Sequence, residues 1–240
     1  MKTTFRWTLS AGFALASGLT GFSHSAVLAA SETSPTITIH VRNYAGVDPQ
    51  TLKEAEKVAT EIYRKAGVET RWENVPLAAE KGQQNSAQHQ TFTLADIQLN
   101  ILPDVMSDRS GLSNNVMGLA PGTGPDRGIV YVFDRKVRTL LWRISSGYIR
   151  GDMDRHISMG QILGHVIAHE VGHLLLNQQV HSPHGIMRGE WDHVDFRDMT
   201  CGMLLFAPSQ AEFLRADVLR RNTPRKTSTV AELESPALTP

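Results

Sequence analysis

The stretch that decides the fold is His169-Glu170-Val171-Gly172-His173, in a chain of 240 residues. Two histidines four residues apart lie on one face of a helix, about one turn from each other, so both imidazoles can bind one cation. Glu170 follows the first histidine and is directed to the same place. In zinc hydrolases the imidazoles hold the metal, which lowers the pKa of a bound water to about 7, and the carboxylate accepts that water's proton. These residues therefore predict a zinc site with Glu170 as its general base.

The motif is predicted to lie on a largely buried helix over residues 158–177. Ser158 and Gln161 have the spacing of a capping box, and Asn177, which tolerates the left-handed conformation, is expected to end the helix. Gly172 costs roughly 1 kcal/mol relative to Ala inside a helix, which indicates that another group packs closely against it. Apolar residues fill the helical positions between these ends: Ile162, Leu163, Val166, Ile167, Val171, Leu174 and Leu175.

A third protein ligand is needed, because a catalytic zinc site has three protein ligands and one open position. His181 is the first choice, since the four residues after Asn177 span up to roughly 13 Å and can return an imidazole to the metal. His184 is the alternative third ligand, and Glu190 is a more distant one. If His181 and His184 both bound, the site would be closed and its role structural.

These residues resemble the metzincins, and within them the matrixin-like proteases, whose pattern is H-E-x-x-H-x-x-G-x-x-H followed by a Met-turn. The chain matches the first five positions and then departs: Leu176 and Gln179 stand where the Gly and the third His belong, and the His-Ser pair comes two residues late. The stretch HEVGHLLLNQQVHSPHGIM is also similar to bacterial secreted proteins with HExGHLLLGxxxHSxxGIM, where Asn177 for Gly is the only departure. The resemblance implies that Met187 forms the Met-turn, a hydrophobic floor beneath the metal.

The pattern upstream of the motif predicts a strand, a helix and four further strands, in the order of the metzincin N-terminal subdomain. The strands are expected over residues 36–43, 68–72, 95–102, 115–120 and 128–133, and the helix over 49–66. We therefore expect an α+β, zincin/metzincin-like fold: a mixed twisted sheet, an active-site helix carrying HExxH, and a small C-terminal helical subdomain with a closing helix over 208–221. The resemblance also implies that residues 115–120 form a substrate-binding sheet edge; an ordinary hairpin is the alternative.

The N-terminus has the features of a secretory signal peptide. Lys2 and Arg6 precede an apolar run over residues 7–22, and Val27-Leu28-Ala29 provides a small-residue cleavage site. We expect a signal peptide over residues 1–29, a metzincin-like zinc peptidase domain over 30–221 and a disordered tail over 222–240, which is rich in proline and poor in apolar residues. The mature protein should be secreted or periplasmic and have no membrane span; an uncleaved anchor is the alternative.

The charge balance and the cysteine content of the chain indicate which kinds of partner it binds. Loss of residues 1–29 leaves 22 basic and 24 acidic residues, a balance that does not favour nucleic acid. Cys201 is the only cysteine, so no internal disulfide forms and no upstream thiol blocks the metal. We expect an exported endopeptidase with a Zn²⁺ cofactor and a peptide or protein substrate. The alternative is a non-catalytic zinc-stabilised secreted protein or peptide-binding module, but such a site has no use for Glu170.

Two aromatic residues near the motif have two interpretations each. His165 lies one turn before His169 and either supports the groups around the metal or is an ordinary core histidine. Trp191 follows the expected Met-turn and either lines the pocket or simply packs against its neighbours.

Overall fold

The computed structural model describes residues 34–77, 93–103, 116–121, 128–147, 157–177 and 181–223. The chain divides into two units, residues 1–33 and Ser34–Pro240, and all described residues belong to the second. The expected signal peptide over 1–29 and most of the expected tail over 222–240 lie outside the described residues. Among the described residues, no helix has the length and apolar character that crossing a bilayer requires.

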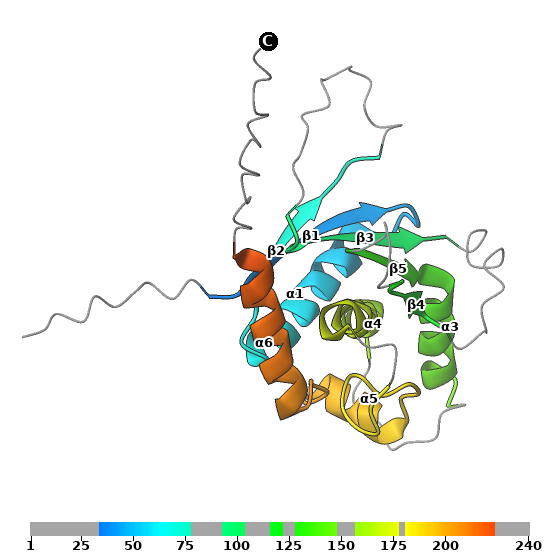
Figure 1. Cartoon of the computed structure of the whole chain (residues 1–240). Helices are drawn as coiled ribbons and strands as arrows, with labels where there is room; N and C mark the ends of the chain where they lie inside the picture. Colours follow the sequence, from blue (N-terminus) through cyan, green and yellow to red (C-terminus); the bar gives the residue numbers. More distant parts are fainter. Residues whose placement is uncertain are drawn as a thin grey trace, which may run out of the picture. The chain divides into compact units, whose positions relative to one another are not determined.

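The central element is a mixed sheet of five strands in the order β2-β1-β3-β5-β4 (Figure 1). Its strands are β1 (Thr36–Asn43), β2 (Glu69–Asn74), β3 (Asp96–Leu102), β4 (Gly118–Leu119) and β5 (Ile129–Phe133). Four strands are parallel, and β4 alone pairs antiparallel with β5, at the edge of the sheet. The predicted strands are all present, although β4 is shorter than predicted because only two residues of 116–121 pair with β5.

Two helices cover the apolar face of the sheet (Figure 1). Helix α1 (Pro49–Lys65) follows β1 and packs against α4 (Met159–Leu176), which also contacts β4 and β5. Alternate residues of the strands point to these helices and are fully buried, as the period of two in a strand requires: Ile37, Ile39, Ile97, Leu99, Ile101, Val130 and Val132. Helix α4 is therefore surrounded by protein, which places the motif inside the fold.

The ends of α4 are the ones predicted. The Ser158 hydroxyl accepts from the Gln161 backbone N–H at 3.0 Å, and the Gln161 side chain accepts from the Ser158 N–H at 3.0 Å, which completes the capping box. Asn177 ends the helix in the left-handed conformation at φ 50°. Every residue from Ile162 to Leu176 is buried. Helix α4 is therefore a core helix, buried on all of its faces from residue 162 to residue 176.

Gly172 has the close neighbours that its cost inside a helix indicated. A Cβ atom at this position would lie 2.7 Å from the Met187 sulfur and 2.8 Å from a ring carbon of Phe206. A methyl group does not fit into that space. The glycine thus lets the segment around Met187 lie directly against α4.

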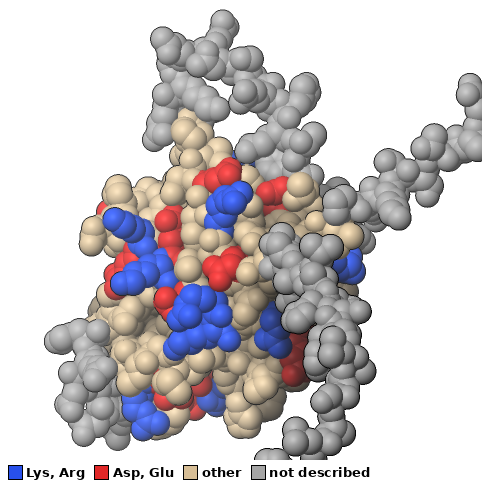
Figure 2. All heavy atoms as spheres, turned by 90° about the vertical axis from the view of Figure 1, so that its left-hand side faces the viewer, with Lys and Arg blue, Asp and Glu red and all other residues tan. Residues whose placement is uncertain are grey.

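The remaining helices pack around α4. Helices α3 (Asp134–Ser145), α5 (His193–Thr200) and α6 (Pro208–Asn222) each contact it. The closing helix predicted over 208–221 is present as α6, within a C-terminal helical part that also contains α5. Neither α3 nor the bounds of α5 were predicted from the sequence. On the face shown in Figure 2, Lys and Arg side chains are interspersed with Asp and Glu.

Candidate metal centre

Three histidine side chains come together beside α4. His169 and His173 lie one turn apart on the helix, and His181 follows the end of the helix. One ring nitrogen of each lies within 4.8 Å of one ring nitrogen of the others, and the Nε2 atoms of His169 and His173 are 3.0 Å apart. Within the described ranges, this is the one group of three or more His, Cys, Asp or Glu side chains that can hold a metal ion.

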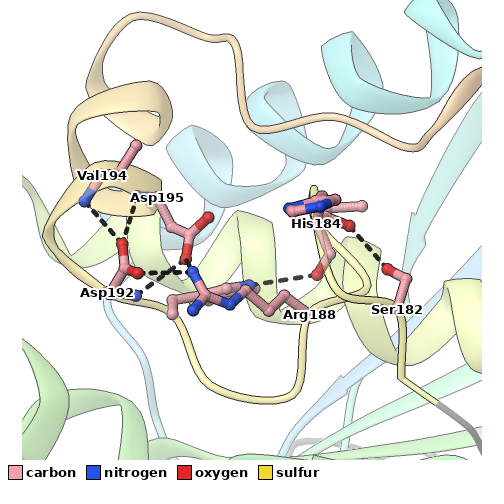
Figure 3. Close-up of polar contacts among 8 residues, drawn as sticks. Ser182, His184, Arg188, Asp192, Val194 and Asp195 are labelled. Carbon is pink, nitrogen blue, oxygen red and sulfur yellow. Dashed lines mark hydrogen bonds and ion pairs between the residues drawn. The ribbon is translucent and has the colours of Figure 1, made fainter.

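The alternative third ligands do not belong to this group. His184 is exposed, and its backbone carbonyl accepts a hydrogen bond from the Ser182 hydroxyl at 2.7 Å (Figure 3). Glu190 lines the cavity at the histidines but is not a member of the group. The structure thus brings His181 to the other two histidines, as predicted, and among the described residues the group has these three members.

The electrostatics of His169 suit a metal ligand. Burial, helped by the neighbouring histidines and opposed by the hydrogen bond to Ile186, lowers its pKa to about 4. The Nδ1 atom is 2.7 Å from the Ile186 carbonyl oxygen, which can only accept, so Nδ1 carries the hydrogen. The Nε2 lone pair is therefore available and faces His173. Three neutral imidazole nitrogens are a donor set that fits Zn²⁺.

The segment after α4 is held by a network of hydrogen bonds. The Ser182 N–H donates to the Met187 carbonyl at 2.9 Å, which closes the loop that carries His184. Gly185 adopts φ 74°, and a Cβ there would lie 2.6 Å from the Leu205 carbonyl oxygen. The loop therefore requires a glycine. Its course brings Met187, almost fully buried, against α4 at Gly172, and its role as a Met-turn stays a prediction.

An ion-pair cluster fixes the far end of this segment (Figure 3). Arg188 donates to Asp192 at 2.7 Å and to Asp195 at 2.8 Å. The Asp192 carboxylate also caps α5 by accepting from the Val194 N–H at 2.8 Å. Residues 188–191 are thus tied to the start of α5, and they form one wall of the cavity at the histidines.

Glu170 is buried against the edge strand. A Cβ added to Gly118 of β4 would lie 2.6 Å from the Glu170 carboxyl carbon and 2.7 Å from its Oε1. The carboxyl group therefore fits only because residue 118 has no side chain. Burial raises the pKa of Glu170 to about 8. A cation held by the histidines would favour the charged carboxylate and lower this pKa.

The histidines and Glu170 share one cavity of about 250 Å³. Residues 116–120 of the edge-strand segment line one side, and residues 188–191 line the other. Helix α4 contributes Val166, His169, Glu170 and His173 between them. The cavity therefore joins a candidate metal centre, a buried carboxyl group and a sheet edge.

Two residues of this site were not given a defined role by sequence analysis. Gly118 is one, although a glycine in a strand is a signal of a close approach by another group. Trp191 is the other; it lines the cavity, which favours the first of its two interpretations. Its indole N–H donates to the Ile186 carbonyl, five positions earlier in the chain, at 3.2 Å.

Comparison with known proteins finds likeness among solved structures and none among sequences. No protein-family model and no curated protein sequence matches this chain. Among solved structures, the chain is similar to the archaemetzincin of Methanopyrus kandleri, with a TM-score of 0.43 and 13% sequence identity over 78% of this chain and 97% of that one. The chemistry of the site therefore rests on this chain's own residues.

Proposed function

We propose that this chain is an exported zinc-dependent endopeptidase. The observation that carries the proposal is the convergence of three histidine nitrogens, all within 4.8 Å of one another, in a cavity that also contains Glu170 and the edge strand β4. His169, His173 and His181 would hold the metal. Zinc in such a site supplies a Lewis acid and an open position in which a water molecule has a pKa near 7.

Glu170 would act as the general base and then as the proton donor. Its carboxylate accepts a proton from the attacking water, whose oxygen forms a bond to the peptide carbonyl carbon. The same carboxyl group then donates that proton to the leaving nitrogen as the C–N bond breaks. The position against Gly118 supports this role, because it holds the carboxyl group within the cavity that the histidines line.

Strand β4 would bind the substrate. It is the edge strand of the sheet that the described residues form and its segment lines the cavity, so an extended peptide would pair with its outer side by strand addition. The competing proposal, a non-catalytic zinc protein, is less well supported. His184 lies outside the histidine group, which has three members among the described residues, as in sites that keep an open position.

Zinc dependence tests the proposal. Protein purified without chelator should contain one zinc ion per chain and should cleave members of a mixed peptide library. Dialysis against a chelator should abolish cleavage, and stoichiometric zinc should restore it. A protein with less than one zinc after reconstitution, or full cleavage by the metal-free chain, would contradict the proposal.

Export is a separate part of the proposal. We propose that residues 1–29 are removed during export, on the strength of the basic start, the apolar run and the small residues at 27–29. N-terminal sequencing of the protein recovered outside the cytoplasm should begin at Ala30. A mature chain that still begins at Met1 would support the anchor instead.

A substitution at Gly118 tests the position of Glu170. In Gly118→Ala the new methyl group would collide with the Glu170 carboxyl group, which must then leave its place. We expect kcat/KM for peptide cleavage to fall by about tenfold or more, because a catalytic group displaced by an ångström loses much of its effect. Zinc content, measured by elemental analysis, should remain at one per chain.

Gly160→Ala is the matched control. A Cβ at Gly160 would meet the side chain of Glu54, 2.8 Å from its carboxyl carbon, at the α1 side of α4. It therefore creates the same kind of collision away from the cavity and should leave kcat/KM nearly unchanged. Equal losses in the two variants would mean that Gly118 acts only through stability.

A further inference from the structure

Trp191 connects the wall of the cavity to one of the metal-binding histidines. Its ring lies edge-on to His169, with ring centroids 5.8 Å apart and an interplanar angle of 88°. It also lies edge-on to His165, with centroids 6.4 Å apart and an angle of 83°. Edge-to-face arrangements at such distances are the favourable ones for aromatic rings. The indole therefore lies against two rings of the same face of α4.

The carbonyl of Ile186 receives hydrogen bonds from both side chains. His169 Nδ1 lies 2.7 Å from its oxygen, and Trp191 Nε1 lies 3.2 Å from it. A carbonyl oxygen has two lone pairs, so it can accept both. Ile186 is fully buried, and its own N–H donates to the Leu205 carbonyl at 2.9 Å. The indole thus holds in place the oxygen that orients His169.

His165 provides the support behind the indole. It is almost fully buried on α4, and burial lowers its pKa to about 4, so it is neutral at pH 7. Its Nδ1 lies 2.8 Å from the Gln161 carbonyl oxygen, which fixes the ring to its own helix. Trp191 therefore packs on a ring that is itself held in one orientation.

We infer that Trp191 is a positioning residue, which acts on the metal centre through Ile186 and fixes the tautomer and orientation of His169. The inference rests on the proposed function, because it requires that His169 binds the metal. With Nδ1–H held by the carbonyl, the Nε2 lone pair of His169 has to face His173, where their nitrogens are 3.0 Å apart. Partners of this kind typically change metal affinity by 10–100-fold.

Trp191→Phe tests the inference because it keeps an aromatic ring and removes the N–H donor. Trp72→Phe is the matched control: the Trp72 indole donates to the Thr60 hydroxyl at 2.8 Å, between β2 and α1 and outside the cavity. Zinc affinity is measured on each metal-free, folded protein by competition with a chromogenic chelator. We expect Trp191→Phe to weaken zinc binding by about tenfold, and Trp72→Phe to leave it unchanged.

A spectroscopic measurement distinguishes positioning from general stability. The visible absorption of the Co²⁺-substituted protein depends on ligand geometry, so its bands should shift in Trp191→Phe and not in Trp72→Phe. If Trp191→Phe does not fold, Trp191→Tyr, which keeps an aromatic ring and adds a polar end without the indole N–H, is assayed against the same control. Zinc affinity that is unchanged or tighter in the folded position-191 variant, with an unshifted Co²⁺ spectrum, would overturn the inference. Failure of the wild type to bind zinc would instead contradict the proposed function.

Discussion

Replacing Glu170 with glutamine is expected to lower kcat for peptide hydrolysis by at least roughly a hundredfold, while zinc content and fold stay near wild type. Loss of a general base typically costs this much, because the carboxylate placed to take the water's proton in the transition state is gone. Glutamine has the same shape as glutamate, so it fits the space against Gly118. The carboxyl group is also not a member of the histidine group, so metal affinity should change little. Parallel digestion of a peptide library by both proteins, each checked for zinc, measures the effect.

Glu56→Gln is the matched control for that experiment. Glu56 lies on α1, where it accepts a hydrogen bond from Asn74 at 3.1 Å, and it is not among the residues that line the cavity. This variant should cleave peptides at the wild-type rate. If Glu170→Gln and wild type cleave equally fast, Glu170 is not the base or the activity comes from a contaminant. If fully zinc-loaded wild type cleaves no peptide, the peptide-binding module becomes the better account.

Removing the third histidine is expected to have the largest effect on metal affinity. His181→Ala deletes one of the three nitrogens of the group, whereas His184→Ala deletes an exposed ring outside it. Loss of a group that merely orients a ligand already costs 10–100-fold, so we expect His181→Ala to weaken zinc binding by about a hundredfold or more. His184→Ala should bind zinc nearly as well as wild type. Competition with a chromogenic chelator measures both.

His181→Ala and His184→Ala together also test the unusual spacing between His173 and the third ligand along the chain. His181 lies two residues beyond the position that the matrixin pattern gives to its third histidine. Equal losses for His181→Ala and His184→Ala would indicate a closed site that uses both rings. A larger loss for His184→Ala would reassign the third ligand.

Local patterns were sufficient to predict α4 and the strands. The apolar spacing, the capping pair Ser158 and Gln161, and the left-handed Asn177 all act within a few residues of one another, so the sequence displays them directly. The closeness of His181 to the other two histidines was predicted from chain reach, and the structure confirms it. Gly172 likewise indicated a close contact, which is made by Met187 and Phe206.

Helix α3, strand β4 and two contacts of the site are less evident from the local sequence. Helix α3 begins directly after β5, its N-cap is Phe133, and no side chain caps it, so the sequence has no start signal there. Strand β4 has two paired residues, too few for an alternating pattern. The contact of Gly118 with Glu170 joins segments that are far apart in sequence. The hydrogen bond between His169 and the Ile186 carbonyl spans 17 positions and crosses the end of α4. Such contacts depend on tertiary packing, which spacing along the chain does not specify.

The central claim is that His169, His173 and His181 hold one zinc ion and leave a fourth position open. Its most direct test is anomalous diffraction at the zinc absorption edge, measured on crystals of the zinc-loaded mature protein. We expect one anomalous peak, at about 2.0–2.1 Å from one nitrogen of each of His169, His173 and His181. The fourth position should be occupied by a non-protein ligand on the side of Glu170. A peak at another place, or a site in which His184 is the fourth ligand and no position is open, would contradict a catalytic zinc centre in this protein.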